Sequence, residues 1–206
     1  MAKASYAATK KALKSDRLFI QVIEKNIYLT EGHFIIYMPL AHYNEFLAGT
    51  RTGKNAVLPA LVNDDDAFYE LKWDGITKKE DGLNIKKFFD DLKSRDYHIA
   101  NFSPIIFEID KNRFLRTLIY RDGEIVHGVA VSKIFTDALE DWFDLTKPVY
   151  SIDEKSPLYI TNDCYGIMIL PVNVGHDSDF TEFIKSMNAE HELNKKIKEL
   201  EKRQYA

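Results

Sequence analysis

The pattern of apolar and polar positions in this 206-residue chain repeats once. In both copies an apolar run meets an acidic residue and a glycine, and a second apolar run follows: residues 27–36 around Gly32, and residues 118–126 around Gly123. Two apolar runs joined by such a turn are typical of a β-hairpin. The glycines lie 123 − 32 = 91 residues apart. We therefore predict an internal duplication, which would build a pseudo-symmetric sheet.

Each copy is predicted to run through a helix, a strand, a hairpin, a second helix, a second strand and a second hairpin. Helices are expected at residues 3–16, 40–48, 84–95 and 133–143. Strands are expected at residues 18–23, 57–62, 67–73, 105–109, 114–120, 149–152, 157–160 and 165–170, besides the hairpin around Gly32. This order of elements favours the α+β class, with mostly antiparallel sheets and packed helices.

The helix at residues 84–95 has the clearest pattern of all. Ile85, Phe88, Phe89 and Leu92 recur at helical spacing and form one apolar stripe. For the helix at residues 133–143, Ser132 is the expected N-cap, because a serine oxygen can accept a hydrogen bond from a free backbone N–H of the first turn.

The chain changes character near its C-terminal end. We predict one domain at residues 1–175, built of two repeats at about 1–80 and 84–174, followed by a helical tail at 176–206. The first part of the tail carries an apolar docking stripe, formed by Phe180, Phe183, Ile184 and Met187. Further on, Leu193, Ile197 and Leu200 stand among Lys and Glu. Fewer than three heptads of this pattern favour a helix that docks at its start and frays at its end over a coiled coil.

Composition and charge narrow the class of protein. Apolar residues make up 45% and charged residues 29% of the chain, which is typical of a folded globular protein, and the net charge of −4 gives no general attraction to nucleic acid or acidic lipid. No apolar run approaches 18 residues and the N-terminus lacks a signal-peptide core, so we expect a cytoplasmic protein without a membrane span. Cys164, the single cysteine, is predicted to be a small buried or half-buried residue rather than a nucleophile.

Motifs that would carry catalysis or bind a metal or cofactor are weak. The glycine-containing segment at 49–55 has the wrong spacing for a phosphate loop and precedes a predicted strand, so we interpret it as a surface loop. The three aspartates at 64–66 are expected to form a solvated turn, and helix capping accounts for Asp177 and Asp179 beside His176. The six histidines show no ligand spacing for zinc. We therefore expect no catalytic residue, no metal site and no cofactor.

One basic stripe is a candidate binding site. At 100° per residue, four cationic side chains fall within roughly 60° of one another on the first predicted helix. They are Lys3, Lys10, Lys14 and Arg17. Such a stripe could follow a phosphate backbone or an acidic partner, although it is more typical of a solvated helix face. Binding to phosphate here would depend strongly on salt.

The stretch from about 105 to 173 resembles part of a bacterial DNA sliding clamp, the polymerase processivity ring. The matching residues are 128–139, read as a strand running into a helix, then 156–160, and finally 166–172 as the closing strand. The resemblance implies a duplicated domain in which each half contributes helices and antiparallel strands. It implies DNA or a protein as the partner. The chain has room for one such domain. The charged side chains of its helices at 40–48 and 133–143 are mostly acidic, Glu45, Asp137, Glu140 and Asp141 against Lys133, and they would repel DNA.

Three hypotheses on function follow. The first is a non-enzymatic binding or accessory module with a clamp-like fold, associated with DNA metabolism. The second is a small enzyme whose site lies at the junction of the repeats; a deep pocket with at least two strongly perturbed titratable groups would favour it. The third is a homo-oligomer joined through the C-terminal helix, in which truncation after Val174 would lower the mass in solution.

Overall fold

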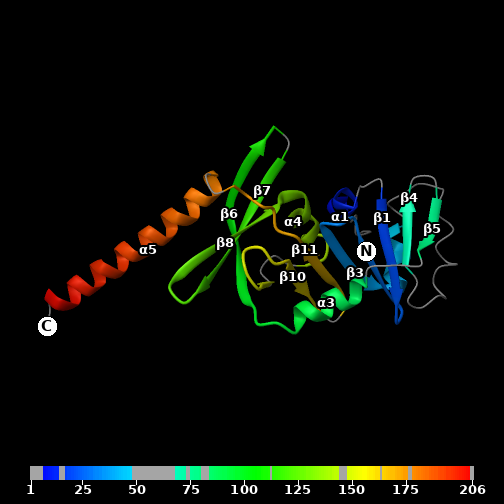
Figure 1. Cartoon of the computed structure of the whole chain (residues 1–206), viewed down its shortest axis with the longest axis horizontal. Coiled ribbons are helices and arrows are strands. Elements are labelled where there is room, and N and C mark those ends of the chain that lie inside the picture. The colour runs from blue at the N-terminus through cyan, green and yellow to red at the C-terminus, as the bar shows by residue number, and fades with distance from the viewer. Residues whose placement is uncertain are drawn as a thin grey trace, which may run out of the picture.

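The computed structural model describes residues 7–13, 17–47, 68–72, 75–79, 84–111, 113–143, 148–162, 164–175 and 178–204 (Figure 1). The helices of this part are α1 (Ala7–Ala12), α2 (Leu40–Leu47), α3 (Ile85–Lys93), α4 (Lys133–Leu139) and α5 (Asp179–Gln204). The strands are β1 (Arg17–Ile23), β2 (Asn26–Thr30), β3 (Phe34–Pro39), β4 (Phe68–Lys72), β5 (Gly75–Lys79), β6 (His98–Asp110), β7 (Arg113–Asp122), β8 (Ile125–Ser132), β9 (Val149–Ser151), β10 (Leu158–Thr161) and β11 (Gly166–Ile169).

These strands form one 11-stranded sheet in the order β5-β4-β1-β2-β3-β11-β10-β9-β6-β7-β8. Each neighbouring pair is antiparallel. The predicted class, a mixture of helices with a mostly antiparallel sheet and a C-terminal helix, is confirmed. The centre of the sheet is the pair β3–β11, where Ile36 is aligned with Ile167 and Ile35 with Met168.

Both predicted hairpins are present, but they occupy different places in the sheet. The β2–β3 turn at Gly32 has a backbone φ of +113° and the β7–β8 turn at Gly123 has +58°, so each uses the conformational freedom of glycine. The first hairpin ends at the central strand β3, whereas the second ends at the edge strand β8. A duplication with a spacing of 91 residues and the domain bounds built on it stay predictions.

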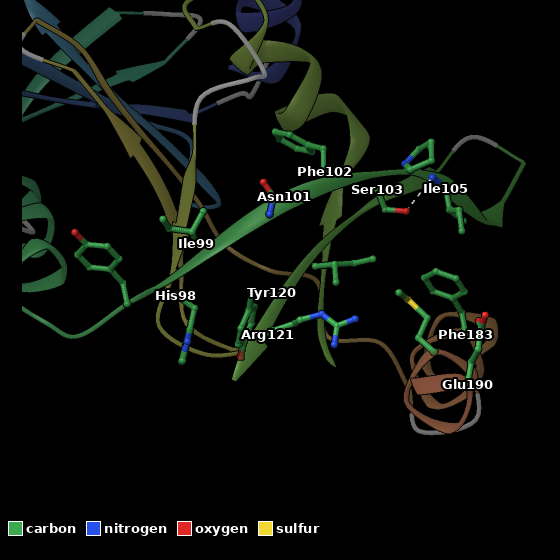
Figure 2. Close-up of a pocket in the computed structure, with 14 residues that line it drawn as sticks. His98, Ile99, Asn101, Phe102, Ser103, Ile105, Tyr120, Arg121, Phe183 and Glu190 are labelled. Carbon is green, nitrogen blue, oxygen red and sulfur yellow. Dashed lines mark hydrogen bonds between the residues drawn. The ribbon is translucent and has the colours of Figure 1, made fainter. Parts of the chain in front are cut away.

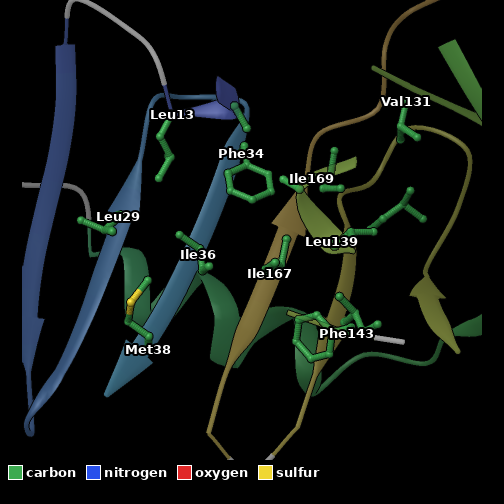
Figure 3. Packing of buried hydrophobic residues seen from close by; sticks show 14 of the residues in the cluster. Leu13, Leu29, Phe34, Ile36, Met38, Val131, Leu139, Phe143, Ile167 and Ile169 are labelled. Atoms are coloured by element: carbon green, nitrogen blue, oxygen red, sulfur yellow. The ribbon is translucent and has the colours of Figure 1, made fainter. Parts of the chain in front are cut away.

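Apolar residues are buried on both faces of the central strands. Successive side chains of a strand point to opposite faces. On β3, Phe34 and Ile36 join the larger core cluster, shown in Figure 3, while Ile35 joins a second cluster on the other face. The larger cluster is covered by residues of α4, including Ala138 and Leu139. The second cluster is covered by α3.

Polar contacts join α1 to α4 at the edge of the larger cluster. The Asp141 Oδ2 atom accepts hydrogen bonds from the Thr9 backbone N–H at 2.7 Å and from the Thr9 hydroxyl at 2.8 Å. The Trp142 indole N–H donates to the same hydroxyl oxygen at 2.7 Å. Because Thr9 is fully buried, these bonds satisfy polar groups that would otherwise destabilise the fold.

Several predicted bounds are wrong for local reasons. Strand β6 begins at His98, well before the predicted start at 105, and passes through Pro104 with a register shift between Phe102 and Ile106. A proline is tolerated in a strand at such an irregularity, because its missing N–H is not needed there. Strand β5 was not predicted. The expected strand at 57–62 and the loop at 49–55 lie outside the described residues.

Helix α4 is shorter than the predicted 133–143. After Leu139 the chain makes i→i−3 bonds, from the backbone N–H groups of residues 140–142 to the oxygens of residues 137–139, and this tighter turn ends the α-helix. Ser132 stands at the N-cap position, but its side chain makes no capping hydrogen bond. Helix α1 is described only at Ala7–Ala12 within the predicted 3–16.

The prediction for Cys164 is wrong, because this cysteine is exposed. The Asn162 side-chain oxygen accepts hydrogen bonds from the backbone N–H groups of Cys164 and Tyr165, both at 2.8 Å. Such a turn holds the chain reversal in place and leaves Cys164 at its tip.

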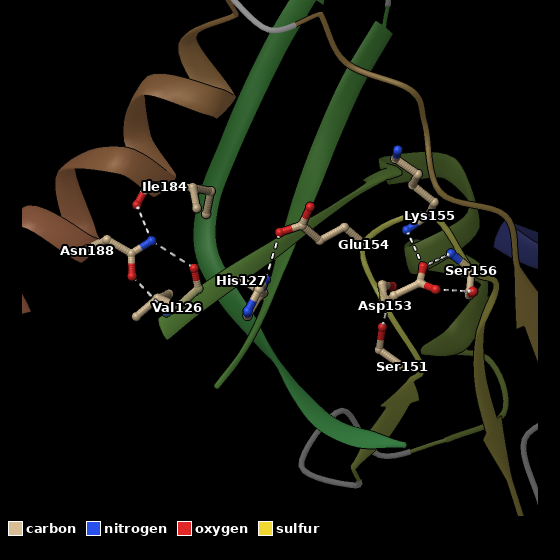
Figure 4. A network of polar contacts seen from close by, with 9 residues as sticks. All are labelled: Val126, His127, Ser151, Asp153, Glu154, Lys155, Ser156, Ile184 and Asn188. Atoms are coloured by element: carbon tan, nitrogen blue, oxygen red, sulfur yellow. Dashed lines mark hydrogen bonds and ion pairs between the residues drawn. The ribbon is translucent and has the colours of Figure 1, made fainter. Parts of the chain in front are cut away.

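The C-terminal helix α5 docks at its beginning and then extends away from the sheet (Figure 1). Phe180 is buried, and the Phe107 ring contacts both Phe180 and Phe183 with centroid distances of 5.7 Å. In Figure 4 the Asn188 side chain meets the edge strand β8: its oxygen accepts from the Val126 N–H at 2.7 Å and its nitrogen donates to the Val126 carbonyl at 2.9 Å. Among the described residues, no helix has the length and apolar character needed to cross a membrane.

Candidate binding site

An apolar pocket of about 370 Å³ lies on the face of the sheet that α3 covers. Its lining comes from β1, β2, β3, β4, β11, the β2–β3 turn and α3, and comprises Phe19, Thr30, Gly32, His33, Ile35, Phe68, Phe88, Met168 and Leu170. Phe19 and Phe68 form one stacked wall, with ring centroids 5.5 Å apart and an angle of 13° between the planes. Because most of the lining is apolar, the pocket favours an apolar group over a charged one.

Helix α3 is held beside this pocket by buried apolar side chains and by hydrogen bonds at its N-terminus. Ile85 and Phe89 are buried against the sheet, and the Ile85 N–H donates to the buried Gln21 side-chain oxygen at 2.8 Å. The Asn84 side chain caps the helix by accepting from the Lys87 N–H at 2.9 Å. The same helix therefore positions Phe88 at the pocket, where its side chain is 38% exposed. Of the predicted stripe, Ile85, Phe89 and Leu92 are buried, and Phe88 is its exposed edge.

The β2–β3 turn forms the opposite rim. The Thr30 hydroxyl accepts from the Gly32 N–H at 2.9 Å, and the Glu31 carboxylate accepts from the N–H groups of His33 and Phe34 at 2.7 and 2.9 Å. These bonds hold the turn in one conformation, so the rim is preformed. The His33 ring is largely exposed and lies 3.5 Å from the Glu31 carboxylate, an ion pair only when the histidine is protonated.

A second and more open hollow, of about 970 Å³, lies between the β6–β7 pair and α5 (Figure 2). Strand residues His98, Phe102 and Arg121 line it together with Phe183 and Glu190 of the helix. The Arg121 guanidinium lies 3.4 Å from the ring nitrogen Nδ1 of His191. This groove is mixed in character, with aromatic, cationic and acidic groups on its walls.

Three stacked rings cross the strands at the end of this groove. His98 stacks on Tyr120 at 4.7 Å, and Tyr120 stacks on His127 at 4.9 Å. His127 is held by Glu154 at 2.8 Å, as Figure 4 shows. Burial, followed by the nearby carboxylates of Glu154, Asp153 and Asp122, raises the pKa of Tyr120 to about 12. At neutral pH this phenol is therefore protonated and can donate a hydrogen bond, but it cannot serve as a base.

The predicted basic stripe lies only partly within the described residues, so it is not tested. Lys10 lies in α1, and Arg17 is the first residue of β1 rather than part of the helix. Lys3 and Lys14 lie outside the described residues, as do the aspartates at 64–66 and the pair His176 and Asp177. Binding of nucleic acid or an acidic partner by this stripe stays a prediction.

The acidic side chains of Asp137 in α4 and of Glu140 directly after it form ion pairs within the chain. Asp137 pairs with Lys133 at 2.6 Å, and Glu140 pairs with Arg116 at 3.2 Å. Within the described ranges, no group of three or more His, Cys, Asp or Glu side chains is arranged to hold a metal ion.

The sequence patterns did not predict the apolar pocket. Its residues come from five strands, a turn and a helix, and each of them fits its own element as an ordinary core residue. One signal was present: Phe88 widens the apolar stripe of α3 beyond what Ile85, Phe89 and Leu92 need to cover the sheet.

Comparisons with known proteins give matches among solved structures alone. No protein-family model matches the chain, and no curated protein matches it. Similar solved structures include a putative DNA polymerase III beta subunit from Eubacterium rectale, at 15% identity over 84% of this chain and 65% of that chain, with a TM-score of 0.38. The beta subunit from DNA polymerase of Streptococcus pyogenes has 11% identity over 84% of this chain and 63% of its own, with a TM-score of 0.36.

The DNA polymerase III beta sliding clamp of Bartonella birtlesii is a further example, at 9% identity over 87% of this chain and 64% of that chain, with a TM-score of 0.33. The chain thus spans less than two thirds of the length of each of these three proteins. TM-scores this low describe a partial superposition, and the function proposed below rests on the apolar pocket of this chain.

Proposed function

We propose that this protein is a non-enzymatic binding module whose apolar pocket accepts a large apolar side chain of a protein partner. The proposal rests on the pocket itself. It is a preformed hollow of about 370 Å³, with the stacked rings of Phe19 and Phe68 as one wall and Met168 of β11 among its other lining residues. Ligand-binding pockets in proteins usually have volumes of ~300–1,000 Å³ and mostly apolar walls.

The position of Phe88 supports this function. An aromatic side chain that is 38% exposed at the rim of an apolar pocket is available to contact an incoming group. Aromatic residues, phenylalanine among them, are enriched at protein–protein interfaces relative to the rest of the surface. The polar rim, formed by Thr30 and His33, would orient the partner rather than supply most of the affinity.

We also propose that the protein is associated with DNA metabolism, as the sequence resemblance implies. It depends on which protein binds the pocket, and none of the described residues that line the pocket is a lysine or an arginine for direct contact with a nucleic acid. We propose a protein as the immediate partner, with DNA reached only through it.

A binding assay with defined peptides tests the proposal. Short labelled peptides, each with one Leu, Phe or Trp in a Ser/Gly background, are titrated with the full chain, and fluorescence polarisation is recorded. We expect at least one aromatic or leucine peptide to bind with a Kd below about 1 mM. The Phe88→Asp variant should weaken that binding by about tenfold or more, because a carboxylate would enter an apolar hollow.

Lys87→Asp is the matched control, since Lys87 is exposed on the neighbouring position of α3 and does not line the pocket. The proposal is overturned if no peptide binds at about 1 mM, or if Lys87→Asp weakens binding as much as Phe88→Asp does. Unfolding curves of both variants establish that α3 is still docked.

A further inference from the structure

Three polar side chains on one face of α5 hold the middle of this helix to the β7–β8 hairpin. Asn188, His191 and Lys195 recur at spacings of three and four residues, so they share a face of the helix. Their partners on the hairpin are, in that order, the Val126 backbone, Arg121 and Glu124. The beginning of α5 is docked by apolar side chains instead. The middle of the helix is therefore the part whose attachment can respond to a change of charge.

The contact between Arg121 and His191 requires a neutral histidine. The Arg121 Nη1 atom lies 3.4 Å from the His191 Nδ1 atom. A guanidinium group has N–H donors and no acceptor, so Nδ1 must accept the hydrogen bond and cannot carry a hydrogen itself. A protonated imidazole carries a hydrogen on both ring nitrogens. Protonation of His191 would therefore remove this hydrogen bond and place a second positive charge beside Arg121.

The acidic groups near His191 do not replace the lost bond. Glu124 of the hairpin is close enough for His191 to lower the pKa of its carboxyl group, but its ion pair with Lys195 lowers that pKa more and already occupies the carboxylate. Asp122 follows Arg121 in β7, so it points to the other face of the sheet. The acidic neighbours of His191 on α5 itself are exposed, and they are Glu190 and Glu192. Arg121 is the hairpin group in direct contact with His191, and it would repel the protonated ring.

The histidine on the opposite face of the hairpin responds to protonation in the other direction. His127 Nδ1 lies 2.8 Å from Glu154 Oε1, in the turn between β9 and β10 (Figure 4). An ionised carboxylate only accepts, so this nitrogen carries the hydrogen. Protonation of the ring leaves the hydrogen bond in place and makes it a charge-assisted one, which is stronger.

The stack of rings on the same face favours the protonated state as well. The Tyr120 ring lies between the rings of His98 and His127, and a cation against the face of an aromatic ring is stabilised. The other charged groups near Tyr120 are carboxylates, those of Asp153 and Asp122. Protonation therefore holds the hairpin more firmly to the sheet.

Acid should accordingly loosen α5 without loosening the hairpin. Histidine is the side chain that ordinarily changes its charge between about pH 5 and 8. We propose that α5 is a pH-dependent arm, in which protonation of His191 releases the middle of the helix from the β7–β8 hairpin. Phe180 and Ile184 keep the beginning of the helix docked. Met187 and Glu190 line the hollow between α5 and the β6–β7 pair, so the release widens this hollow.

Hydrogen exchange of the full chain tests the release. The Val126 N–H is bonded to Asn188, so its protection factor, which is corrected for the intrinsic effect of pH on exchange, reports the docking of the middle of α5. We expect this factor to fall about threefold or more between about pH 7.5 and about pH 5.5, a change typical of a contact between exposed charges. The amide of Leu118, which is paired with strands on both sides, should keep its protection.

Two variants assign the effect to the proposed contact. His191→Gln should abolish the pH response at Val126, because a glutamine oxygen can accept from Arg121 and does not titrate. His42→Gln, on α2, is the matched control and should keep the response. The proposal is overturned if the protection of Val126 does not change with pH, or if it falls as much in His191→Gln. An equal loss at Leu118 also overturns it, because the hairpin itself would then open. These readouts do not involve the apolar pocket, so they are independent of the peptide-binding proposal.

Discussion

Helices α3 and α5 show how differently length and anchoring contribute to a fold. Helix α3 has only nine residues, yet Ile85, Phe89 and Leu92 are buried beneath the sheet. Helix α5 has 26 residues, yet its outer half exposes Leu193, Ile197 and Leu200 to solvent. The short helix is part of the core, and the long one is an attached arm. Burial of apolar surface, rather than the number of helical residues, decides which of the two the fold depends on.

The two helices also differ in how their polar contacts act. The buried Gln21 side chain accepts a hydrogen bond from the first backbone N–H of α3, so this N–H has a partner inside the protein. Helix α5 reverses this relation, because its own side chain Asn188 satisfies the backbone of the edge strand β8. Covering a free strand edge in this way prevents unwanted pairing with other strands. The first contact stabilises the core, and the second shields an edge.

The largest effect is expected from truncating the buried ring of α3. Phe89 is 1% exposed, so Phe89→Ala should lower the free energy of unfolding by roughly 3–5 kcal/mol through lost burial and a cavity. Urea unfolding measures the change. Phe88→Ala is the matched control on the same helix, and it should cost below about 1 kcal/mol because its ring is partly in solvent. Equal losses for the two variants would remove the distinction between core and rim on α3.

A smaller effect is expected where α5 crosses β8. A Cβ added at Gly128 would lie 2.3 Å from Ile184 Cδ1 and 2.6 Å from Ile184 Cγ1. Gly128→Ala should therefore weaken docking of α5 by about 1–3 kcal/mol, since the isoleucine must shift. Faster proteolytic cleavage within α5 is the expected readout. Gly175→Ala, where a Cβ meets no atom within 4 Å, should leave the cleavage rate unchanged.

Removing the amide that caps β8 should have a milder and more local effect. Asn188→Ala deletes both hydrogen bonds to Val126, at a cost of roughly 1 kcal/mol. Hydrogen exchange at the Val126 amide should become faster, while exchange at Ile85, whose N–H is bonded to Gln21, should not change. Faster exchange at both amides would mean that loss of the α5 contact also loosens α3, so that the two helices are not independent.

The two buried tyrosines should make stability depend on pH in alkali, and they should have no such effect at neutral pH. Burial raises the pKa of Tyr28, near α3, and of Tyr120, near the α5 groove, from 10.0 to about 12. A pKa raised on folding gives stability that is complete below the unfolded pKa and is lost as the pH rises through the folded one. Stability should therefore fall between pH 10 and about 12. Tyr28→Phe and Tyr120→Phe should each flatten that fall, as measured by urea unfolding at each pH.

Local patterns were sufficient for the elements whose cause is local. The hairpins at Gly32 and Gly123 were predicted because only glycine readily adopts the positive φ that these turns use. The stripe of α3 was predicted from helical spacing, and the docking residues at the start of α5 from theirs. The antiparallel class of the sheet followed from short connections between apolar runs.

The tertiary structure decided where these elements meet. In the sheet order, strands β1–β3 and strands β9–β11 join at the pair β3–β11. This pairing joins residues more than a hundred positions apart, and no spacing of glycines along the chain encodes it. The same limit applied to Phe88, whose exposure depends on how far the sheet extends beneath α3.

The sequence by itself thus determined turns, helix faces and the exposed character of the outer α5 stripe, because backbone sterics and the 3.6-residue period act between near neighbours. Only the tertiary structure placed Phe19, Phe68, Phe88 and Met168 around one pocket. Each is an ordinary apolar residue in its own element. The pocket exists because strands distant in the chain pair side by side, and that long-range packing is decided by the burial of the whole sheet.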